Sequence, residues 1–180
     1  MKTILLAFDS FKGSLTSAEV ADAFEEGLRS ISPNFCVKKV CMADGGEGTA
    51  EALVSTLGGE WIEVEVLDPL MRPVCARYGL VDDGQTAVIE MAEASGLTLL
   101  SEEERNPLKT STYGTGQLIA DALARGCRKI LVGIGGSATN DAGTGMLEAL
   151  GYRFLDSAGN ILKGCGEALG RISSIDCSNV

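Results

Sequence analysis

Histidine is absent from this sequence of 180 residues. Every catalytic arrangement that needs an imidazole is therefore excluded, including Ser-His-Asp and Cys-His hydrolysis, the H-E-x-x-H zinc motif and phosphohistidine chemistry. Proton transfer must then use Asp, Glu, Lys, Tyr or water. The G-x-x-x-x-G-K-[ST] pattern of a Walker A motif and the G-x-G-x-x-G fingerprint of dinucleotide-binding domains are also missing.

Paired cysteines and long apolar runs are missing too. The six cysteines contain no C-x-x-C pair, and the N-terminal segment lacks the layout of a secretory signal, so we expect reduced core thiols rather than disulfides or zinc ligands. No run approaches the length of a membrane span, so the expected location is the cytoplasm, with no membrane partner. The cysteines are Cys36, Cys41, Cys75, Cys127, Cys165 and Cys177.

Positive charge is scarce, because 15 Lys and Arg stand against 25 Asp and Glu, which gives a net charge of −10. Nucleic-acid binding needs a cationic surface and is therefore excluded. An anionic substrate would need a site that is built locally, from backbone N–H groups, a few Lys or Arg and a divalent cation.

Alternating helical and strand-like patterns, with 45% hydrophobic residues, predict an α/β fold. We expect a parallel sheet of the Rossmann or flavodoxin type with helices on both faces. Residues 1–60 would begin this lobe. Residues 61–180 would form part of a second α/β lobe that begins with antiparallel strands and is incomplete. Residues 3–8 and 130–134 are apolar enough to be buried strands.

A glycine-rich turn joins the strand at 130–134 to a helix that begins near Met146. Glycines and a helix N-terminus offer backbone N–H groups to a phosphate. Asn140 and Asp141 in this turn are natural Mg²⁺ ligands or proton acceptors. The alternative is that the glycines only allow a tight turn. The predicted phosphate-binding residues here are Gly135, Gly136, Ser137 and Thr139.

Two further helices begin after turns rich in glycine and hydroxyl groups, at residues 43–49 and 110–116. Asp44 precedes the pair Gly45-Gly46 and could bind a metal or accept a proton, although Asp44 and Thr49 could equally cap the helix. Three such entries in one chain favour a phosphate-handling protein over a purely structural one.

Polar residues also follow the first predicted strand. Asp9, Ser10 and Lys12 lie where the carboxyl edge of a parallel sheet lines a ligand crevice. The alternative is that Asp9 and Ser10 cap the turn and Lys12 is solvated. Further along, Glu93 or Ser95 could also reach a site at this edge.

Five motifs together resemble the bacterial glycerate kinase family. They are F-D-S-F-K-G-S-L at 8–15, A-D-G-G-E-G-T at 43–49, M-A-E-A-S-G-L at 91–97, T-S-T-Y-G-T-G-Q-L-I at 110–119 and G-I-G-G-S-A-T-N-D-A-G-T-G-M at 133–146. The family motif usually begins A-P-D-S, and Phe8 here replaces its proline. Members of the family are considerably longer, so the chain is expected to match their N-terminal part.

The resemblance implies ATP-dependent phosphorylation of D-glycerate with Mg²⁺, in a cleft between two α/β lobes, with 2-phosphoglycerate favoured as the product. The chemistry of phosphoryl transfer then suggests roles for residues of the motifs. The catalytic candidates are Lys12, Asp44 and Asp141, and Asp44 or Asp141 would hold the metal. The substrate-binding candidates are Asp9, Ser10 and Arg105, and Gly45 and Gly46 join the phosphate-binding set.

Other functions stay open at this point. A non-catalytic nucleotide- or anion-binding module, a kinase of another small hydroxy acid, or a structural subunit without a ligand would fit the same glycine-rich turns. The sequence also leaves open which lobe binds ATP and whether the protein forms a homo-oligomer.

Overall fold

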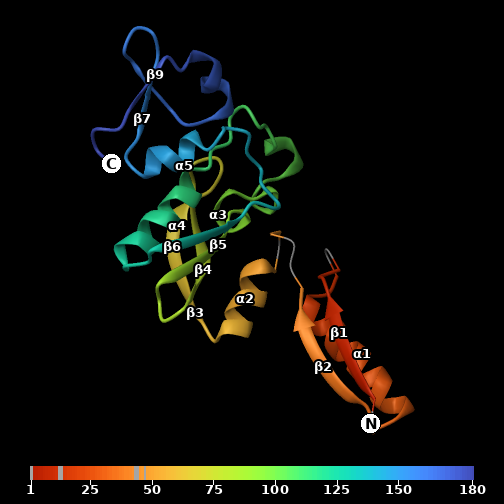
Figure 1. Ribbon diagram of the computed structural model, residues 1–180. Helices are drawn as coiled ribbons and strands as arrows, with labels where there is room; N and C mark the ends of the chain where they lie inside the picture. The colour runs from red at the N-terminus through yellow and green to blue at the C-terminus, as the bar shows by residue number, and fades with distance from the viewer. Residues whose placement is uncertain (1, 12–13, 43–44, 47) are drawn as a thin grey trace.

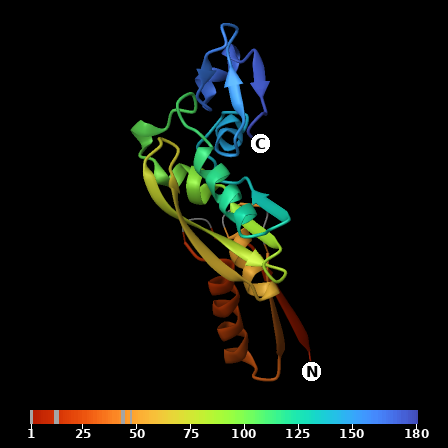
Figure 2. The same ribbon diagram turned by 90° about the vertical axis from the view of Figure 1, so that its left-hand side faces the viewer.

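A computed structural model describes residues 2–11, 14–42, 45–46 and 48–180. The N-terminal segment consists of β1 (Thr3–Phe8), α1 (Ser17–Ile31) and β2 (Cys36–Cys41). The two strands pair in parallel, and α1 packs on one face of the pair. This segment extends away from the rest of the molecule, as Figures 1 and 2 show.

Local sequence explains where α1 begins. Thr16 caps the helix through a predicted capping box, in which its hydroxyl accepts from the Glu19 amide while the Glu19 carboxylate accepts from the Thr16 amide. The ring of Phe8 meets that of Phe24 at a centroid distance of 4.6 Å, which attaches the helix to β1. The hydrogen bonds from Thr16 hold the pKa of Glu19 below its usual value.

The centre of the molecule is a four-stranded sheet with a helix on each face. Three antiparallel strands are followed by a last strand that runs parallel to its neighbour. Helix α2 covers one face around Val54 and Val88, and α4 covers the other around Ile89 and Leu118. The elements are α2 (Thr49–Leu57), β3 (Glu60–Leu67), β4 (Pro73–Val81), β5 (Thr86–Glu90), α4 (Tyr113–Ala124) and β6 (Lys129–Gly133).

Short helices connect the sheet to the C-terminal part of the chain. α5 packs on α4 and leads into a three-stranded sheet with the order β8-β7-β9, built around Phe154 and Leu162. β7 and β8 pair in antiparallel fashion as a hairpin. The elements are α3 (Ala92–Ser95), η1 (Leu97–Leu99), η2 (Glu102–Glu104), α5 (Thr144–Ala149), β7 (Arg153–Leu155), β8 (Ile161–Leu162), η3 (Gly166–Arg171) and β9 (Ser174–Asp176).

The α/β class, the parallel strand pair and the antiparallel start of the second lobe are as predicted. The burial of two strands is not. In β1 only Leu6 is buried, and Leu5 is 61% exposed. β6 lies at the end of its sheet, where Leu131 is 49% exposed. A continuous apolar run is typical of a strand whose two faces are both covered by helices. Whether the strand is buried depends on the presence of those helices and not on the run itself.

Two further expectations need correction or stay open. All six cysteines are free, as expected, but of these only Cys127 is buried, and Cys75 and Cys177 are exposed. The division near residue 60 stays a prediction, and α2 packs on the sheet that follows it rather than on β1 and β2. Among the described residues, no helix is long and apolar enough to cross a membrane.

Candidate active site

Two of the three predicted glycine-rich turns touch each other. The Gly135 amide donates to the Gly45 carbonyl at 3.1 Å. A side chain at Gly135 would put its Cβ atom 2.5 Å from the Gly46 Cα atom, a distance that real Cβ atoms essentially never show. Glycine is therefore required at residue 135 for close backbone approach, and the turns after β2 and β6 form one surface.

The turn after β6 is held from its other side by the 91–97 motif. The Leu97 amide donates to the Gly136 carbonyl, and the Ala138 amide to the Ser95 carbonyl, both at 2.9 Å. Ser95 itself is fully buried, and its hydroxyl pairs with that of Thr115 at 2.7 Å. Ser95 therefore supports the turn from inside the molecule, whereas Glu93 lines a pocket described below.

Two hydroxyl groups lie next to an exposed glycine in the turn after β6. Ser137 and Thr139 place their hydroxyl oxygens 2.9 Å apart, and the Thr139 amide donates to the Ser137 hydroxyl. Gly136 before them is exposed and has φ +73°, a left-handed conformation that favours glycine. These hydroxyl groups and this backbone can donate hydrogen bonds to an anion.

Asp141 lies inside the protein, at 1% exposure, and its carboxylate is surrounded by donors. One oxygen accepts from the Thr112 amide and hydroxyl, both at 2.8 Å, and from the Gly145 amide at 3.2 Å. The other accepts from the Gly143 amide at 2.9 Å. Asp141 thus joins the third glycine-rich turn to the start of α5. Its role as a metal ligand or base stays a prediction, and these bonds favour a structural role.

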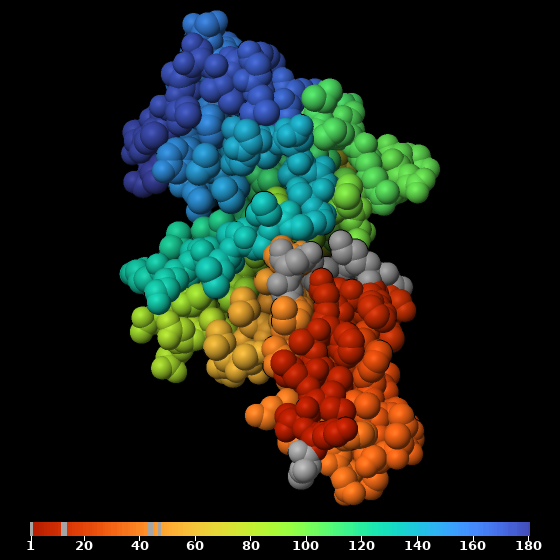
Figure 3. Space-filling model, turned by 45° about the vertical axis from the view of Figure 1, so that its right-hand side comes forward, coloured from red at the N-terminus to blue at the C-terminus, as the bar shows by residue number. Residues whose placement is uncertain are grey.

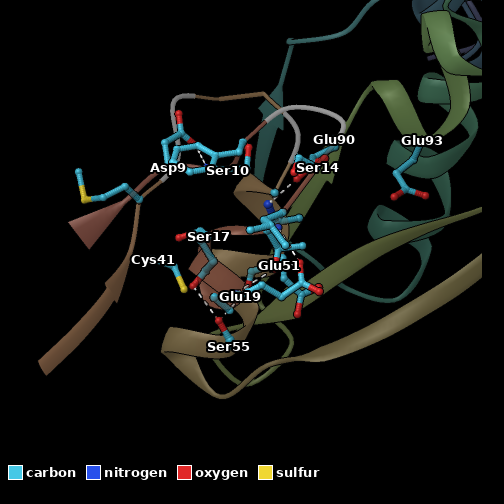
Figure 4. A pocket seen from close by; sticks show the side chains of 18 of the residues that line it. Asp9, Ser10, Ser14, Ser17, Glu19, Cys41, Glu51, Ser55, Glu90 and Glu93 are labelled. Carbon is cyan, nitrogen blue, oxygen red and sulfur yellow. Dashed lines mark hydrogen bonds between the residues drawn. The ribbon is translucent and has the colours of Figure 1, made fainter. Parts of the chain in front are cut away.

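A pocket of about 560 Å³ lies between the N-terminal segment and the central sheet. Figure 4 shows Asp9 and Ser10 on one side of it and Glu51 and Glu90 on the other. Asp9 and Ser10 follow β1 directly, and Glu90 ends β5, so the pocket lies at the carboxyl ends of parallel strands, where ligands bind in open α/β sheets.

Glu90 connects the pocket to the glycine-rich turns. Its carboxylate accepts from the Ala50 amide at 2.7 Å, in the first turn of α2. Glu90 also pairs in register with Gly133, at the start of the turn after β6. The sequence analysis missed Glu90. Its signal is a single acid at the end of the apolar run T-A-V-I-E.

Carboxylates dominate the described wall of the pocket, and Arg77 is the one cation on it. Its guanidinium lies 4.0 Å from the ring centroid of Trp61, and it pairs loosely with Glu51 at 3.6 Å and Glu93 at 3.7 Å. Neither Trp61 nor Arg77 was singled out from the sequence, because each lies within a strand and has no motif around it. The acidic residues are Asp9, Glu19, Glu51, Glu90 and Glu93.

The remaining predicted residues divide into two groups. Lys12 and Asp44 lie outside the described residues. Arg105 is exposed on the connector after η2 and does not line the pocket, and neither do the glycines and hydroxyl groups of the turn after β6. Within the described ranges, no three Cys, Asp or Glu side chains gather in a way that could hold a metal ion.

Known proteins are similar to this chain along nearly its whole length. Residues 4–180 match the glycerate kinase family. Glycerate kinase of Bacillus subtilis (strain 168) is 50% identical over 177 residues, which are 98% of this chain and 46% of that protein. Glycerate 2-kinase of Escherichia coli (strain K12) is 47% identical over 177 residues, with the same two shares of coverage.

A solved structure is also similar. The crystal structure of a protein from Salmonella typhimurium LT2, assigned as glycerate kinase 2, matches with a TM-score of 0.87 and 49% identity, over 99% of this chain and 48% of that chain. This chain spans about half the length of the curated relatives it matches. Because the family match covers nearly every residue, the chain belongs to the glycerate kinase family.

Proposed function

We propose that this chain takes part in ATP-dependent phosphorylation of D-glycerate to phosphoglycerate, with 2-phosphoglycerate as the favoured product. The observation that carries the proposal is the contact between Gly135 and Gly45 beside the pocket of Asp9 and Ser10. Relatives named glycerate kinase at about 50% identity support the same function. The reaction would take place in the cleft that this pocket opens between the N-terminal segment and the central sheet.

The proposed reaction transfers the γ-phosphoryl group of ATP to a hydroxyl of glycerate. The hydroxyl oxygen forms a bond to the γ-phosphorus, the bond from that phosphorus to the β,γ-bridging oxygen breaks, ADP leaves, and a carboxylate takes the hydroxyl proton. Asp9 is one of the carboxylates that line the pocket and could take this proton, and Asp44 and Asp141 are the alternatives from the sequence. Ser10 would contact glycerate there, and a contact from Arg105, which does not line the pocket, stays a prediction from the sequence.

Phosphate binding is assigned to the two touching turns. Backbone amides and hydroxyl groups of the turn after β6 would hold the transferred phosphate, with Gly45 and Gly46 beside them. Lys12 would neutralise phosphate or carboxylate charge in a protein whose net charge is −10. These assignments are supported by the fold and by the chemistry of the residue types.

Mg²⁺ could bind at this site with only a few carboxylate ligands. Mg²⁺ commonly binds through one or two carboxylates and the phosphates of the nucleotide, so a cage of three acids is not needed. As predicted from the sequence, Asp44 or Asp141 would hold the ion, which would offset phosphate charge. A cytoplasmic location and a homo-oligomer stay predictions from the sequence.

The test is an assay of ADP release with Mg-ATP and D-glycerate. It is run on this chain, on the second half of the Bacillus subtilis relative, and on the two mixed. ADP release from the mixture that depends on D-glycerate, with a ³¹P NMR signal of 2-phosphoglycerate, would support the proposal. L-Glycerate, D-lactate and tartronate are the comparison substrates. ADP release with D-lactate and none with D-glycerate would contradict it.

A further inference from the structure

The guanidinium of Arg77 is held over an aromatic ring on the wall of the pocket. Trp61 packs against the cluster of Val54, Val81 and Val88, which joins α2 to the central sheet. The guanidinium lies 4.0 Å from the centroid of the Trp61 ring, within the range of a cation–π contact. Both residues line the pocket. The ring therefore presents a positive charge to the pocket from a well-packed part of the fold.

The ion pairs of Arg77 are long. Distances of about 2.7–2.9 Å are typical of charge-assisted hydrogen bonds between nitrogen and oxygen. Arg72, which joins two segments of the chain, lies 2.6 Å from Asp68. Arg77 instead lies 3.6 Å from Glu51 and 3.7 Å from Glu93. Its N–H groups are therefore not used in short bonds to these two acids.

An arginine in this state can accept a carboxylate ligand. A guanidinium carries five N–H donors in a planar fork that matches the two oxygens of a carboxylate. The side chain of Arg77 is 46% exposed, and those of Glu51 and Glu93 are 57% and 33% exposed. Water can therefore solvate both acids when the guanidinium turns to a ligand. The other charged residues on the described wall are all acidic, so a carboxylate would be repelled elsewhere on it.

A purely structural role for Arg77 is less consistent with these distances. As a bridge, it would join Glu51 of α2 to Glu93 of α3. Exposed ion pairs stabilise a fold by little, and pairs without short hydrogen bonds by less. The contact with Trp61 orients the guanidinium but leaves its N–H groups available.

We propose that Arg77 binds the carboxylate of the acceptor substrate and so selects a hydroxy acid over a neutral polyol. This inference rests on the proposed function, because it assigns a contact to D-glycerate in the same pocket. Asp9 and Ser10, which follow β1, line that pocket and would receive the hydroxyl end of the substrate. One contact at the carboxylate and another at the hydroxyl would orient the substrate for phosphoryl transfer.

The test uses Trp61, the single tryptophan of the chain, as a probe of the Arg77 contact. This chain is titrated with D-glycerate at constant ionic strength, without nucleotide, and its tryptophan emission is recorded. We expect a saturable change. Glycerol carries the hydroxyl groups without the carboxylate and should give none.

Calorimetry then compares the affinity of variants for D-glycerate. Arg77→Gln should weaken binding by about tenfold or more, because charge-assisted hydrogen bonds are lost. Arg77→Lys keeps the charge but not the fork, and should weaken binding by a smaller factor. Arg171→Gln makes the same change of charge at an exposed residue outside the pocket, and should stay within about twofold. Thermal unfolding should be nearly the same in all of them, which separates loss of binding from loss of the fold.

A kinetic measurement adds a second readout. In the mixture with the second half of the Bacillus subtilis relative, Arg77→Gln should raise KM for D-glycerate by about tenfold or more and change kcat by less than about threefold. The reason is that the carboxylate contact is made equally in the ground state and the transition state. A loss of kcat with an unchanged KM would contradict this role.

The outcomes separate this inference from the proposed function. No binding of D-glycerate, equal emission changes with D-glycerate and glycerol, or equal affinity in Arg77→Gln and the unchanged chain would each overturn the inference. The titrations contain no ATP, so these results leave the proposed activity untouched. Binding of D-glycerate that depends on Arg77, with no ADP release from the mixture, would support the inference and count against the proposed activity alone.

Discussion

The central sheet and the N-terminal segment differ in how completely their apolar side chains are buried. In the central sheet, helices cover both faces, and Tyr78, Ile89 and Leu118 are fully buried on the side of α4. In the N-terminal segment a single helix covers a two-stranded sheet, and Leu5 and Val40 are exposed. Figure 3 shows the N-terminal segment, in red and orange, as a body below the green and cyan part.

This difference teaches which residues stabilise the described chain by themselves. Apolar side chains stabilise a fold only when they leave water. Those of the central sheet do so within this chain, whereas part of those on β1 and β2 would do so only after another element covers them. Substitutions in the two regions should therefore differ in size, and the following experiments test that difference.

The largest effect is expected in the core beneath α4. Leu118→Ala should lower the free energy of unfolding by about 2–5 kcal/mol, because Leu118 is fully buried and leaves a cavity. Leu5→Ala should change it by about 0.5 kcal/mol or less in the chain alone. Urea denaturation measures both. Equal losses for the two variants would show that the N-terminal segment is covered in solution.

Asp141→Asn should lower stability by about 2–3 kcal/mol. Its carboxylate accepts four hydrogen bonds. The NH2 group of asparagine cannot accept, so some of these buried donors would lose their partner. Asp83→Asn is the control, because Asp83 is exposed with φ 51°, a conformation that asparagine tolerates. A variant that keeps its melting temperature and loses only Mg-ATP binding would instead favour the metal-ligand role.

Gly135→Ala should separate the two touching turns. The new Cβ atom would lie 2.5 Å from the Gly46 Cα atom, which should lower stability by about 1–3 kcal/mol and turnover by about tenfold or more. Gly27→Ala in α1 is the control, because nothing lies within 4 Å of its added Cβ atom, and it should raise stability by about 0.5–1 kcal/mol. Unchanged turnover in Gly135→Ala would remove the contact from the proposed site.

The smallest effect is a pH dependence of the N-terminal segment that exceeds that of α4. Hydrogen bonds from Lys39 and Arg29 hold the pKa of Glu25 below its usual value of 4.5. The folded pKa is the lower one, so the stabilisation is present above about pH 4.5 and is lost as the pH falls through the folded value. The hydrogen-exchange protection factors of α1 and β2 should therefore fall more than those of α4 on acidification.

Two variants complete that experiment. Glu25→Gln should remove the part of the extra pH dependence that comes from its ion pairs with Lys39 and Arg29, and the part from Glu19 should stay. Glu26→Gln should keep it, since Glu26 makes no ion pair among the described residues. Similar acid sensitivity in α1 and α4 would argue against the assignment to Glu25.

Much of the fold could be predicted because its signals are local. The capping box at Thr16 starts α1, Gly58 ends α2 in the left-handed conformation, and the alternation of Ile62, Val64 and Val66 identifies the buried face of β3. The tail was not predicted. It forms η3 and β9, and β9 is specified by its pairing with β7 rather than by its own sequence.

Part of the site could be predicted because its glycine-rich turns are also local signals. The glycines at 45–46 and 135–136 identify turns, and the tertiary structure places Gly45 against Gly135. Glu90 and Arg77 were missed, because their place on the pocket wall depends on strands that are distant in sequence. The role of Asp141 as a metal ligand or base stays a prediction, and no local pattern reveals the backbone hydrogen bonds that its carboxylate accepts.

The sequence alone identified the family and excluded chemistry that needs histidine. The absence of histidine, the acidic charge and five ordered motifs depend on residue identity, which folding does not change. Only the tertiary structure decided which turns touch, which acids share a pocket, and that one face of β1 is open. These are contacts between residues far apart in the chain, and they follow from how its layers pack rather than from any local pattern.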